Sequence, residues 1–303
     1  MATDFDRDAV LTLRRNFPHL SVYHGSIEDL SSSFILRNTG LDVGALDVLD
    51  GSPPCQGFSV SGKRIFDDDR NKLFREFVRL LDELKPKVFV MENVPGLVAG
   101  KMKLLFVEIL KELKLVGYRV RARSMNSKFY NVPQSRKRII FIGIRSEFDF
   151  EPSYPPPSSP PIAASEAIKD LADINDEEKR MLIEAGRRYP LYRWWHLMTP
   201  GQSVDDVKKG QGFNCVKYHP DRPASTVTKS DARISAFGSL HWAEKRRFTL
   251  AEYKRFASFP DQYLFTDWKN GVERIGNSVP PLLMTAIARH IRAEILPHCL
   301  VTP

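Results

Sequence analysis

The segment Gly51-Ser52-Pro53-Pro54-Cys55-Gln56 combines a thiol with a constrained turn. It directly follows an apolar run, so we expect Cys55 at a strand end, with its backbone fixed by the two prolines. A helix N-terminus or a cation nearby would lower the pKa of such a thiol from about 8.5 and populate the nucleophilic thiolate. A lone cysteine can equally be a small buried apolar side chain. The Pro-Pro setting favours the nucleophile.

Charged side chains stand at two further turns. Glu92, in Glu92-Asn93-Val94, ends an apolar run, where a carboxylate is costly unless it is paired or serves as an acid. In Gln134-Ser135-Arg136-Lys137-Arg138, which opens a strand, alternation predicts that Arg136 and Arg138 share one face. Two guanidinium groups suit a phosphate, a carboxylate or a carbonyl oxygen, although a solvated basic edge would show the same pattern.

A fourth turn and the remaining cysteines complete the candidates. Gly276-Asn277-Ser278-Val279-Pro280-Pro281 indicates a turn that opens a helix. Cys215 and His219 have the spacing of half a zinc site, but no second pair lies nearby in sequence, so we predict no metal site. Cys299 is interpreted as incidental.

An alternation of strands and helices should position these turns. Apolar runs predict strands at 45–49, 87–91, 118–123 and 138–144, and helical spacing predicts helices at 6–16, 71–84 and 103–115. This order is typical of an α/β fold with a mostly parallel sheet covered by helices on both faces. Ligands in such sheets lie beyond the carboxyl ends of the strands, where Cys55 and Glu92 fall.

The pattern changes after Arg145. Residues 151–161 are rich in Pro and Ser and predict a stiff linker, and the stretch to about 243 has poor periodicity, as expected for a smaller, loop-rich lobe. Regular structure is expected to return at 248–256, and a last helix is predicted after Pro280-Pro281. We therefore expect a domain at 1–150, a lobe at 151–243 and a return to the first domain at 244–303.

Composition favours a polyanionic partner in a reducing compartment. The 303 residues carry a net charge of +8, and the pI is near 9.3. The sequence has neither a signal-peptide pattern nor an apolar run long enough to cross a membrane, and its three cysteines are far apart. These features predict a cytoplasmic protein with no membrane partner.

Taken in order, Pro-Pro-Cys-Gln, Glu-Asn-Val, Gln-x-Arg-x-Arg and Gly-Asn-Ser-Val-Pro-Pro resemble the DNA cytosine-5 methyltransferase family, most closely its bacterial and phage members. Lesser matches, such as Arg222-Pro223-Ala224-Ser225-Thr226-Val227-Thr228 and Phe259-Pro260-Asp261, extend the resemblance from about Asp4 to Ile295. It implies an S-adenosylmethionine-dependent, Rossmann-like sheet and a target-recognition lobe. It also implies a double-stranded DNA substrate and a place in a restriction-modification system.

The resemblance also implies roles for the four charged or reactive residues. Cys55 would add to C6 of a cytosine flipped out of the helix, so that C5 can accept a methyl group. Glu92 would hold or protonate N3 of the base. Arg136 and Arg138 would lie near the O2 carbonyl and the active-site carboxylate.

Positions that match the family's cofactor contacts are Asp4, Phe5, Ile27, Pro54, Leu73, Asn277 and Ser278. Ser26 stands where the family usually has Asp. For DNA, the resemblance points to Ser59, Ser61, Lys63 and Arg64 in a mobile loop and to Gly210, Gly212, Lys217 and Arg222 in the lobe.

The chain departs from the family in lacking a Phe-x-Gly-x-Gly segment, which normally ends a first, central strand. We therefore expect the first strand to be missing. Three explanations are a late start or truncation, which we favour, a second polypeptide that supplies the strand, and a homologue that binds DNA without methylating it. A tRNA methyltransferase of the same family is a further interpretation, and the absence of a Cys-Phe-Thr motif in the lobe argues against it.

Overall fold

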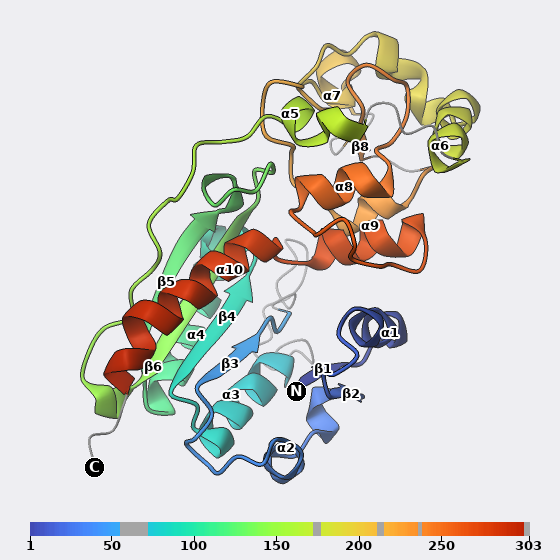
Figure 1. Cartoon of the computed structure of the whole chain (residues 1–303). Coiled ribbons are helices and arrows are strands. Elements are labelled where there is room, and N and C mark those ends of the chain that lie inside the picture. Colours follow the sequence, from blue (N-terminus) through green and yellow to red (C-terminus); the bar gives the residue numbers. More distant parts are fainter. Residues whose placement is uncertain (55–71, 172–176, 211–214, 236–237, 300–303) are drawn as a thin grey trace. The chain divides into compact units, whose positions relative to one another are not determined.

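A computed structural model of the chain describes residues 1–54, 72–171, 177–210, 215–235 and 238–299 (Figure 1). The chain forms two compact units. Unit 1 comprises Met1–Met125, Lys137–Pro155 and Ile287–Pro303, and unit 2 comprises Asn126–Arg136 and Pro156–Ala286. The boundary at Pro155 falls inside the expected Pro-rich linker. By contrast, residues 244–286 group with unit 2, whereas we expected the whole of 244–303 to return to the first domain.

Most of the predicted elements are present, with boundaries shifted by a few residues. The strands are β1 (Ala2–Asp4), β2 (Val22–His24), β3 (Val48–Gly51), β4 (Val88–Asn93), β5 (Tyr118–Asn126), β6 (Lys137–Arg145), β7 (Val216–Lys217) and β8 (Ser239–Leu240). The α-helices are α1 (Arg7–Asn16), α2 (Ser32–Thr39), α3 (Lys72–Leu84), α4 (Lys103–Leu115), α5 (Ala164–Ile168), α6 (Glu177–Arg188), α7 (Val204–Val207), α8 (Leu250–Phe256), α9 (Trp268–Asn277) and α10 (Pro281–His290). None of the helices described is long and apolar enough to cross a membrane.

The main sheet of unit 1 has the order β3-β4-β6-β5. β3 and β4 are parallel, as expected, but β6 runs antiparallel to β4. β5 and β6 are neighbours joined by residues 127–136 alone, and a parallel arrangement would need a crossover of a dozen or more residues. The short connection therefore accounts for the reversed strand.

Alternation along the strands divides this sheet into two faces. Phe89, Met91 and Phe141 point to one face and pack with buried residues of α3 and α4 into a single core. Val90 and Ile142 point to the other face and are also buried. Figure 1 shows helices on both sides of the sheet, and the buried Ile287 and Ile291 belong to the C-terminal part of unit 1. The sheet is thus covered on both faces, as the sequence predicted.

β1 and β2 form a separate two-stranded parallel sheet. Arg79 on α3 links this sheet to the rest of unit 1, because its Nη2 donates to the carbonyls of Ile27 at 3.2 Å and Leu30 at 3.0 Å. Among the described residues, β1 pairs only with β2 and β3 only with β4. The described strands of unit 1 therefore fall into two sheets.

Unit 2 is more regular than its sequence suggested. Its main core contains residues of α5, α6, α8 and α9, including the aromatic residues Phe248 and Trp268. The segment 126–136 joins this unit through backbone bonds between Ser135 and Ala224 at 2.8 Å and between Ala224 and Pro133 at 2.9 Å. Arg136 is therefore embedded in unit 2, although the strand that follows it belongs to unit 1.

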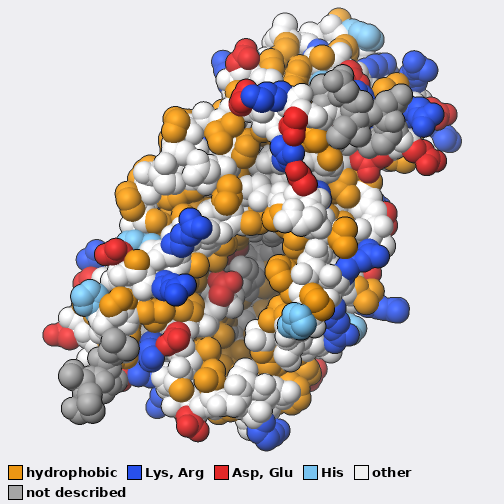
Figure 2. Space-filling view, viewed as in Figure 1, with side chains coloured by type: hydrophobic (Ala, Val, Ile, Leu, Met, Phe, Trp, Pro, Cys, Tyr) orange, Lys and Arg blue, Asp and Glu red, His pale blue; other side chains and the backbone are white. Residues whose placement is uncertain are grey.

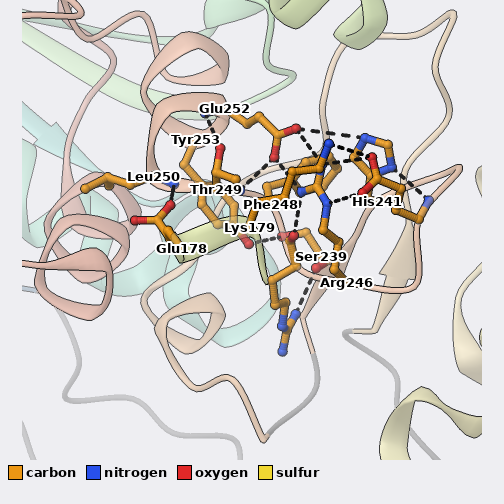
Figure 3. A network of polar contacts seen from close by, with 12 residues as sticks. Glu178, Lys179, Ser239, His241, Arg246, Phe248, Thr249, Leu250, Glu252 and Tyr253 are labelled. Atoms are coloured by element: carbon orange, nitrogen blue, oxygen red, sulfur yellow. Dashed lines mark hydrogen bonds and ion pairs between the residues drawn. The ribbon is translucent and has the colours of Figure 1, made fainter. Parts of the chain in front are cut away.

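A buried ionic network supports the start of α8 (Figure 3). Arg246, which is 1% exposed, donates to Oε2 of Glu252 at 2.7 Å and to Oε1 at 2.9 Å. Glu252 also closes a capping box with Thr249, the N-cap residue of the helix. One carboxylate thus both caps the helix and neutralises a buried guanidinium group.

Candidate active site

The carboxyl ends of β3 and β4 lie side by side, because Gly51 pairs with Met91 in the parallel register. Cys55, the predicted nucleophile, lies outside the described residues, but the turn that leads to it is described as far as Pro54. The amide Nδ2 of Asn93 donates to the Pro53 carbonyl at 3.3 Å. Asn93 therefore ties the end of β4 to the turn that carries Cys55. We had assigned Asn93 no role, although its place beside Glu92 in the motif was a usable signal.

Glu92 forms an ion pair with Arg138. Arg138 Nε lies 2.5 Å from Glu92 Oε1. The Glu92 side chain is 13% exposed and the Arg138 side chain 12%. Glu92 faces Ile140 in the antiparallel register, so Arg138 reaches it from two residues along the same face of β6. The structure thus provides the partner that a carboxylate in this position needs.

Arg136 has a different set of partners. Its side chain is fully buried, Nη1 donates to the Val227 carbonyl at 2.7 Å, and Nη2 donates to the Gly276 carbonyl at 2.8 Å. β6 begins at Lys137, after Arg136, so strand alternation does not place the two arginines on one face as we expected. Within unit 2, Arg136 joins three segments that are far apart in the sequence.

Asp4, Phe5 and Ile27 lie at or just after the carboxyl ends of the paired parallel strands β1 and β2. Asp4 ends β1, and its Oδ1 accepts a hydrogen bond from the Asp6 amide at 2.9 Å, which orients the carboxylate at the start of α1. Phe5 is 75% exposed, and Ile27 begins the 3₁₀ helix that follows β2. An acidic group beside a largely exposed aromatic ring fits the ribose and adenine of a nucleoside.

The other predicted cofactor positions fall in both units. Pro54 is exposed and Leu73, in the first turn of α3, is half-buried, both in unit 1. Asn277 ends α9 and Ser278 follows it, both in unit 2. Gly276 and Asn277 are thus the last residues of α9, and α10 begins at Pro281. We had expected residues 276–281 to form a turn that opens a helix, and the first part of this segment instead ends one.

Among the predicted DNA contacts, Ser59, Ser61, Lys63, Arg64 and Gly212 lie outside the described residues. Arg222 is exposed, and Gly210 adopts a left-handed conformation with φ of 76°. Lys217 is buried, its Nζ donates to the Met198 carbonyl at 3.0 Å, and the same group lies 3.6 Å from the centre of the Trp195 ring. A DNA contact from Lys217 would require these interactions to break, so its position favours a structural role.

Asp50 is a charged residue that we did not predict in this region. It lies on β3 and keeps access to solvent, yet its pKa is raised from 3.8 to about 6, first by desolvation and second by the negative charge of Glu92. The signal in the sequence was a carboxylate just before Gly51 in an otherwise apolar strand. The strand ends therefore hold two interacting carboxylates.

Cys215 and the surface charge give little further indication of a site. Cys215 is fully buried, and burial raises the pKa of its thiol. The described residues contain no group of three or more His, Cys, Asp or Glu side chains that could hold a metal ion. On the face shown in Figure 2, Lys and Arg side chains lie interspersed with Asp and Glu. The described residues of this face therefore show no continuous basic patch that would mark a nucleic-acid surface.

Comparison with known proteins identifies the family. The model of the C-5 cytosine-specific DNA methylase family matches residues 1–293. The chain belongs to this family. Its fold is that of the S-adenosylmethionine-dependent methyltransferases, and S-adenosylmethionine is the methyl donor of the family.

Relatives of this C-5 methylase include two named bacterial enzymes. It is 32% identical to type II methyltransferase M1.HphI of Haemophilus parahaemolyticus over 294 residues, which cover 92% of this chain and 77% of that protein. It is 30% identical to type II methyltransferase M.XorII of Xanthomonas oryzae, with coverage of 96% and 78%.

Solved structures share the fold of this C-5 methylase. A putative DNA modification methyltransferase from an Escherichia coli prophage matches with a TM-score of 0.75 at 22% identity, covering 96% of this chain and 91% of that one. A mutant of Spodoptera frugiperda DNMT2 matches with a TM-score of 0.65 at 19% identity, covering 98% and 91%.

Proposed function

We propose that this chain transfers a methyl group to C5 of a cytosine flipped out of a specific double-stranded DNA sequence, as the modification enzyme of a restriction-modification system. The observation that carries the proposal is the Glu92–Arg138 ion pair at the end of β4, the strand that Asn93 ties to the turn before Cys55. This arrangement occurs in a chain that matches the family over residues 1–293.

Cys55 and Glu92 divide the chemistry between them. The Cys55 thiolate adds to C6 of the cytosine, and the electron pair of the C5–C6 bond becomes available at C5. Glu92 donates a hydrogen bond to N3, which draws the developing charge away from C5 and C6. C5 would then bond to the methyl group of the sulfonium, whose S–CH3 bond would break to leave a neutral thioether. Release of the C5 proton to water would restore the C5–C6 double bond and break the S–C6 bond, which returns the Cys55 thiolate.

Arg138 holds Glu92 in place and offers its guanidinium group to the O2 carbonyl of the base. Arg136, in contrast, stabilises unit 2 through its buried contacts with the carbonyls of Val227 and Gly276. A cytosine within a duplex cannot reach these groups, so the base must leave the helix. Unit 2 is the part of the chain that we assign to sequence recognition, with Arg222 at its surface.

S-adenosylmethionine, when bound, supplies an electrophilic methyl group. Asp4 would accept hydrogen bonds from its ribose hydroxyls, and the exposed ring of Phe5 would lie against its adenine. Ile27, Pro54 and Leu73 would line the same site, and Asn277 and Ser278 are the further positions that we propose as cofactor contacts.

A second candidate is a homologue that binds DNA but needs a further strand, in cis or from a second polypeptide, before it transfers methyl groups. The division of the described strands into a β1–β2 sheet and a β3-β4-β6-β5 sheet favours this candidate. A parallel strand paired with both β1 and β3 would join the two sheets and satisfy the backbone groups of both edges.

A methyl-transfer assay separates the two candidates. Mixed-sequence duplex DNA and isotopically labelled S-adenosylmethionine are incubated with the chain, with the Cys55→Ser variant, and with the chain plus a peptide or upstream segment containing Phe-x-Gly-x-Gly. Incorporation by the chain alone that is lost in Cys55→Ser supports the first candidate. Incorporation only with the added segment supports the second. Incorporation by Cys55→Ser at the same rate would contradict both.

A further inference from the structure

Asp50, Glu92 and Arg138 lie in a row across three strands of the main sheet. Asp50 pairs with Val90 in the parallel register of β3 and β4, so it shares a face with Val90 and with Glu92 two residues later. Glu92 pairs with Ile140 on β6, and Arg138 shares the face of Ile140. The register alone therefore places two carboxylates and one guanidinium group on one face, near the end of β4 that Asn93 ties to the Cys55 turn.

Asp50 and Glu92 place two negative charges on this face. Arg138 is bound to Glu92, and Asp50 adds a second negative charge beside that pair. Among the described residues, Glu92 is the charged side chain whose field raises the pKa of Asp50, while the Gly51 backbone amide acts in the opposite direction. Two carboxylates that interact in this way hold a proton more readily than either would alone.

Asp47 is a second carboxylate next to β3. It directly precedes β3 and is three residues from Asp50, so strand alternation would place the two side chains on opposite faces. It forms an ion pair with Lys87 at 2.7 Å. Its side chain is 61% exposed. Asp47 therefore serves as a matched control for a change of charge at Asp50.

We propose that Asp50 is a positioning residue for Glu92: the negative charge it adds to this face favours the proton that Glu92 holds when it donates to N3 of the target cytosine. The proposal rests on the function proposed above for Glu92. Asp50 itself touches neither the base nor the methyl donor in this account, and acts only through Glu92.

Reciprocal titration tests the coupling without any need for activity. Carboxyl ¹³C NMR spectra are recorded against pH for the wild-type chain and for Asp50→Asn, Glu92→Gln and Asp47→Asn. We expect Asp50→Asn to lower the titration midpoint of Glu92 by roughly one pH unit, and Glu92→Gln to lower that of Asp50 by a similar amount. Asp47→Asn should move neither. The proposal would be overturned if the titration midpoint of Glu92 were unchanged in Asp50→Asn and that of Asp50 were unchanged in Glu92→Gln.

Thermal unfolding shows whether Asp50→Asn keeps the fold. The pKa of Asp50 is higher in the folded chain than in the unfolded one, so its ionised form opposes folding as pH rises through the range from about 4 to 6. We expect Asp50→Asn to melt at a higher temperature than the wild type above pH 6, and at the same temperature below pH 4. Equal melting temperatures at every pH would contradict a desolvated Asp50 carboxylate.

The pH dependence of methyl transfer tests the consequence for Glu92. Loss of the Asp50 charge makes Glu92 ionise at lower pH, so the decline in rate on the alkaline side should shift down by roughly one pH unit in Asp50→Asn. Asp47→Asn should keep the wild-type profile. An unchanged profile in Asp50→Asn would overturn the proposal. A wild-type chain that transfers no methyl group under any condition would instead contradict the proposed function, while the titrations still report on the coupling.

Discussion

Glu92 has an observed structural partner in addition to its proposed chemical role. It ends a strand of buried residues, and its carboxylate is held 2.5 Å from Arg138. The sequence left open whether Glu92 was paired or used as an acid, and the pairing with Arg138 is compatible with both. Asp50 escaped prediction because the apolar run beside it predicted a strand, and a sequence does not show which strand will lie next to it.

Arg138 should matter through its geometry as well as its charge. Arg138→Lys keeps a positive charge but loses the planar fork that can contact Glu92 and the base carbonyl together. We expect kcat to fall by on the order of 100-fold, as for the loss of one preorganised donor to a developing charge. Steady-state methyl-transfer kinetics measure this effect.

Arg121→Lys is the matched control for Arg138. Arg121 is 57% exposed and pairs with Glu151 away from the strand ends that carry the candidate site. It should keep the wild-type kcat. Equal losses in the two variants would show that Arg138 acts only through general stability.

At the scale of elements, local patterns predicted the strands and helices of unit 1 well. The apolar runs at 87–91 and 138–144 became β4 and β6 because both are buried on two faces. α9 was missed, although the buried residues Trp268, Val272 and Ile275 have helical spacing. Its interior Gly271 weakens the helix signal, and packing in the core of unit 2 compensates for it.

The Arg246–Glu252 pair should be important for the stability of unit 2. Glu252→Gln can still cap α8, but it leaves the buried Arg246 guanidinium without its main counter-charge. We expect the free energy of unfolding to fall by about 3–5 kcal/mol. Urea unfolding followed by circular dichroism measures the change.

Glu273→Gln provides the control for this buried pair. Glu273 forms an ion pair with Lys229, whose side chain is 61% exposed, so its loss should cost less than about 1 kcal/mol. If the two substitutions had similar costs, burial of the Arg246–Glu252 pair would not be the source of its contribution.

At the scale of the whole molecule, the division into two units followed only in part from the sequence. One boundary between the units, at Pro155, falls in the Pro-rich stretch. The sequence did not show that segments 126–136 and 244–286 group with unit 2, because the contacts that hold them there are between residues far apart in the chain. Arg136 illustrates this, since its partners are 91 and 140 residues away.

The arrangement of strands connects the fold to the proposed activity. Glu92 and Arg138, which we propose contact the base, lie in the four-stranded sheet, whereas Asp4, a proposed cofactor contact, belongs to the separate β1–β2 sheet. In the proposed reaction, the residues that contact the base and those that contact the cofactor must act on the same methyl transfer. A strand that joined the two sheets would fix the proposed cofactor contacts relative to Glu92 and Arg138. The second candidate function requires such a strand for methyl transfer.

Covalent trapping tests the central claim most directly. A duplex containing 5-fluorocytosine is incubated with the chain and S-adenosylmethionine, with the Phe-x-Gly-x-Gly segment added where the transfer assay requires it. Fluorine at C5 cannot leave as a proton does, so the S–C6 bond persists after methyl transfer. The account predicts a denaturation-resistant complex in which mass spectrometry finds the modified base on Cys55, and no complex with Cys55→Ser. An adduct on another residue, or methyl transfer with no adduct on Cys55, would contradict it.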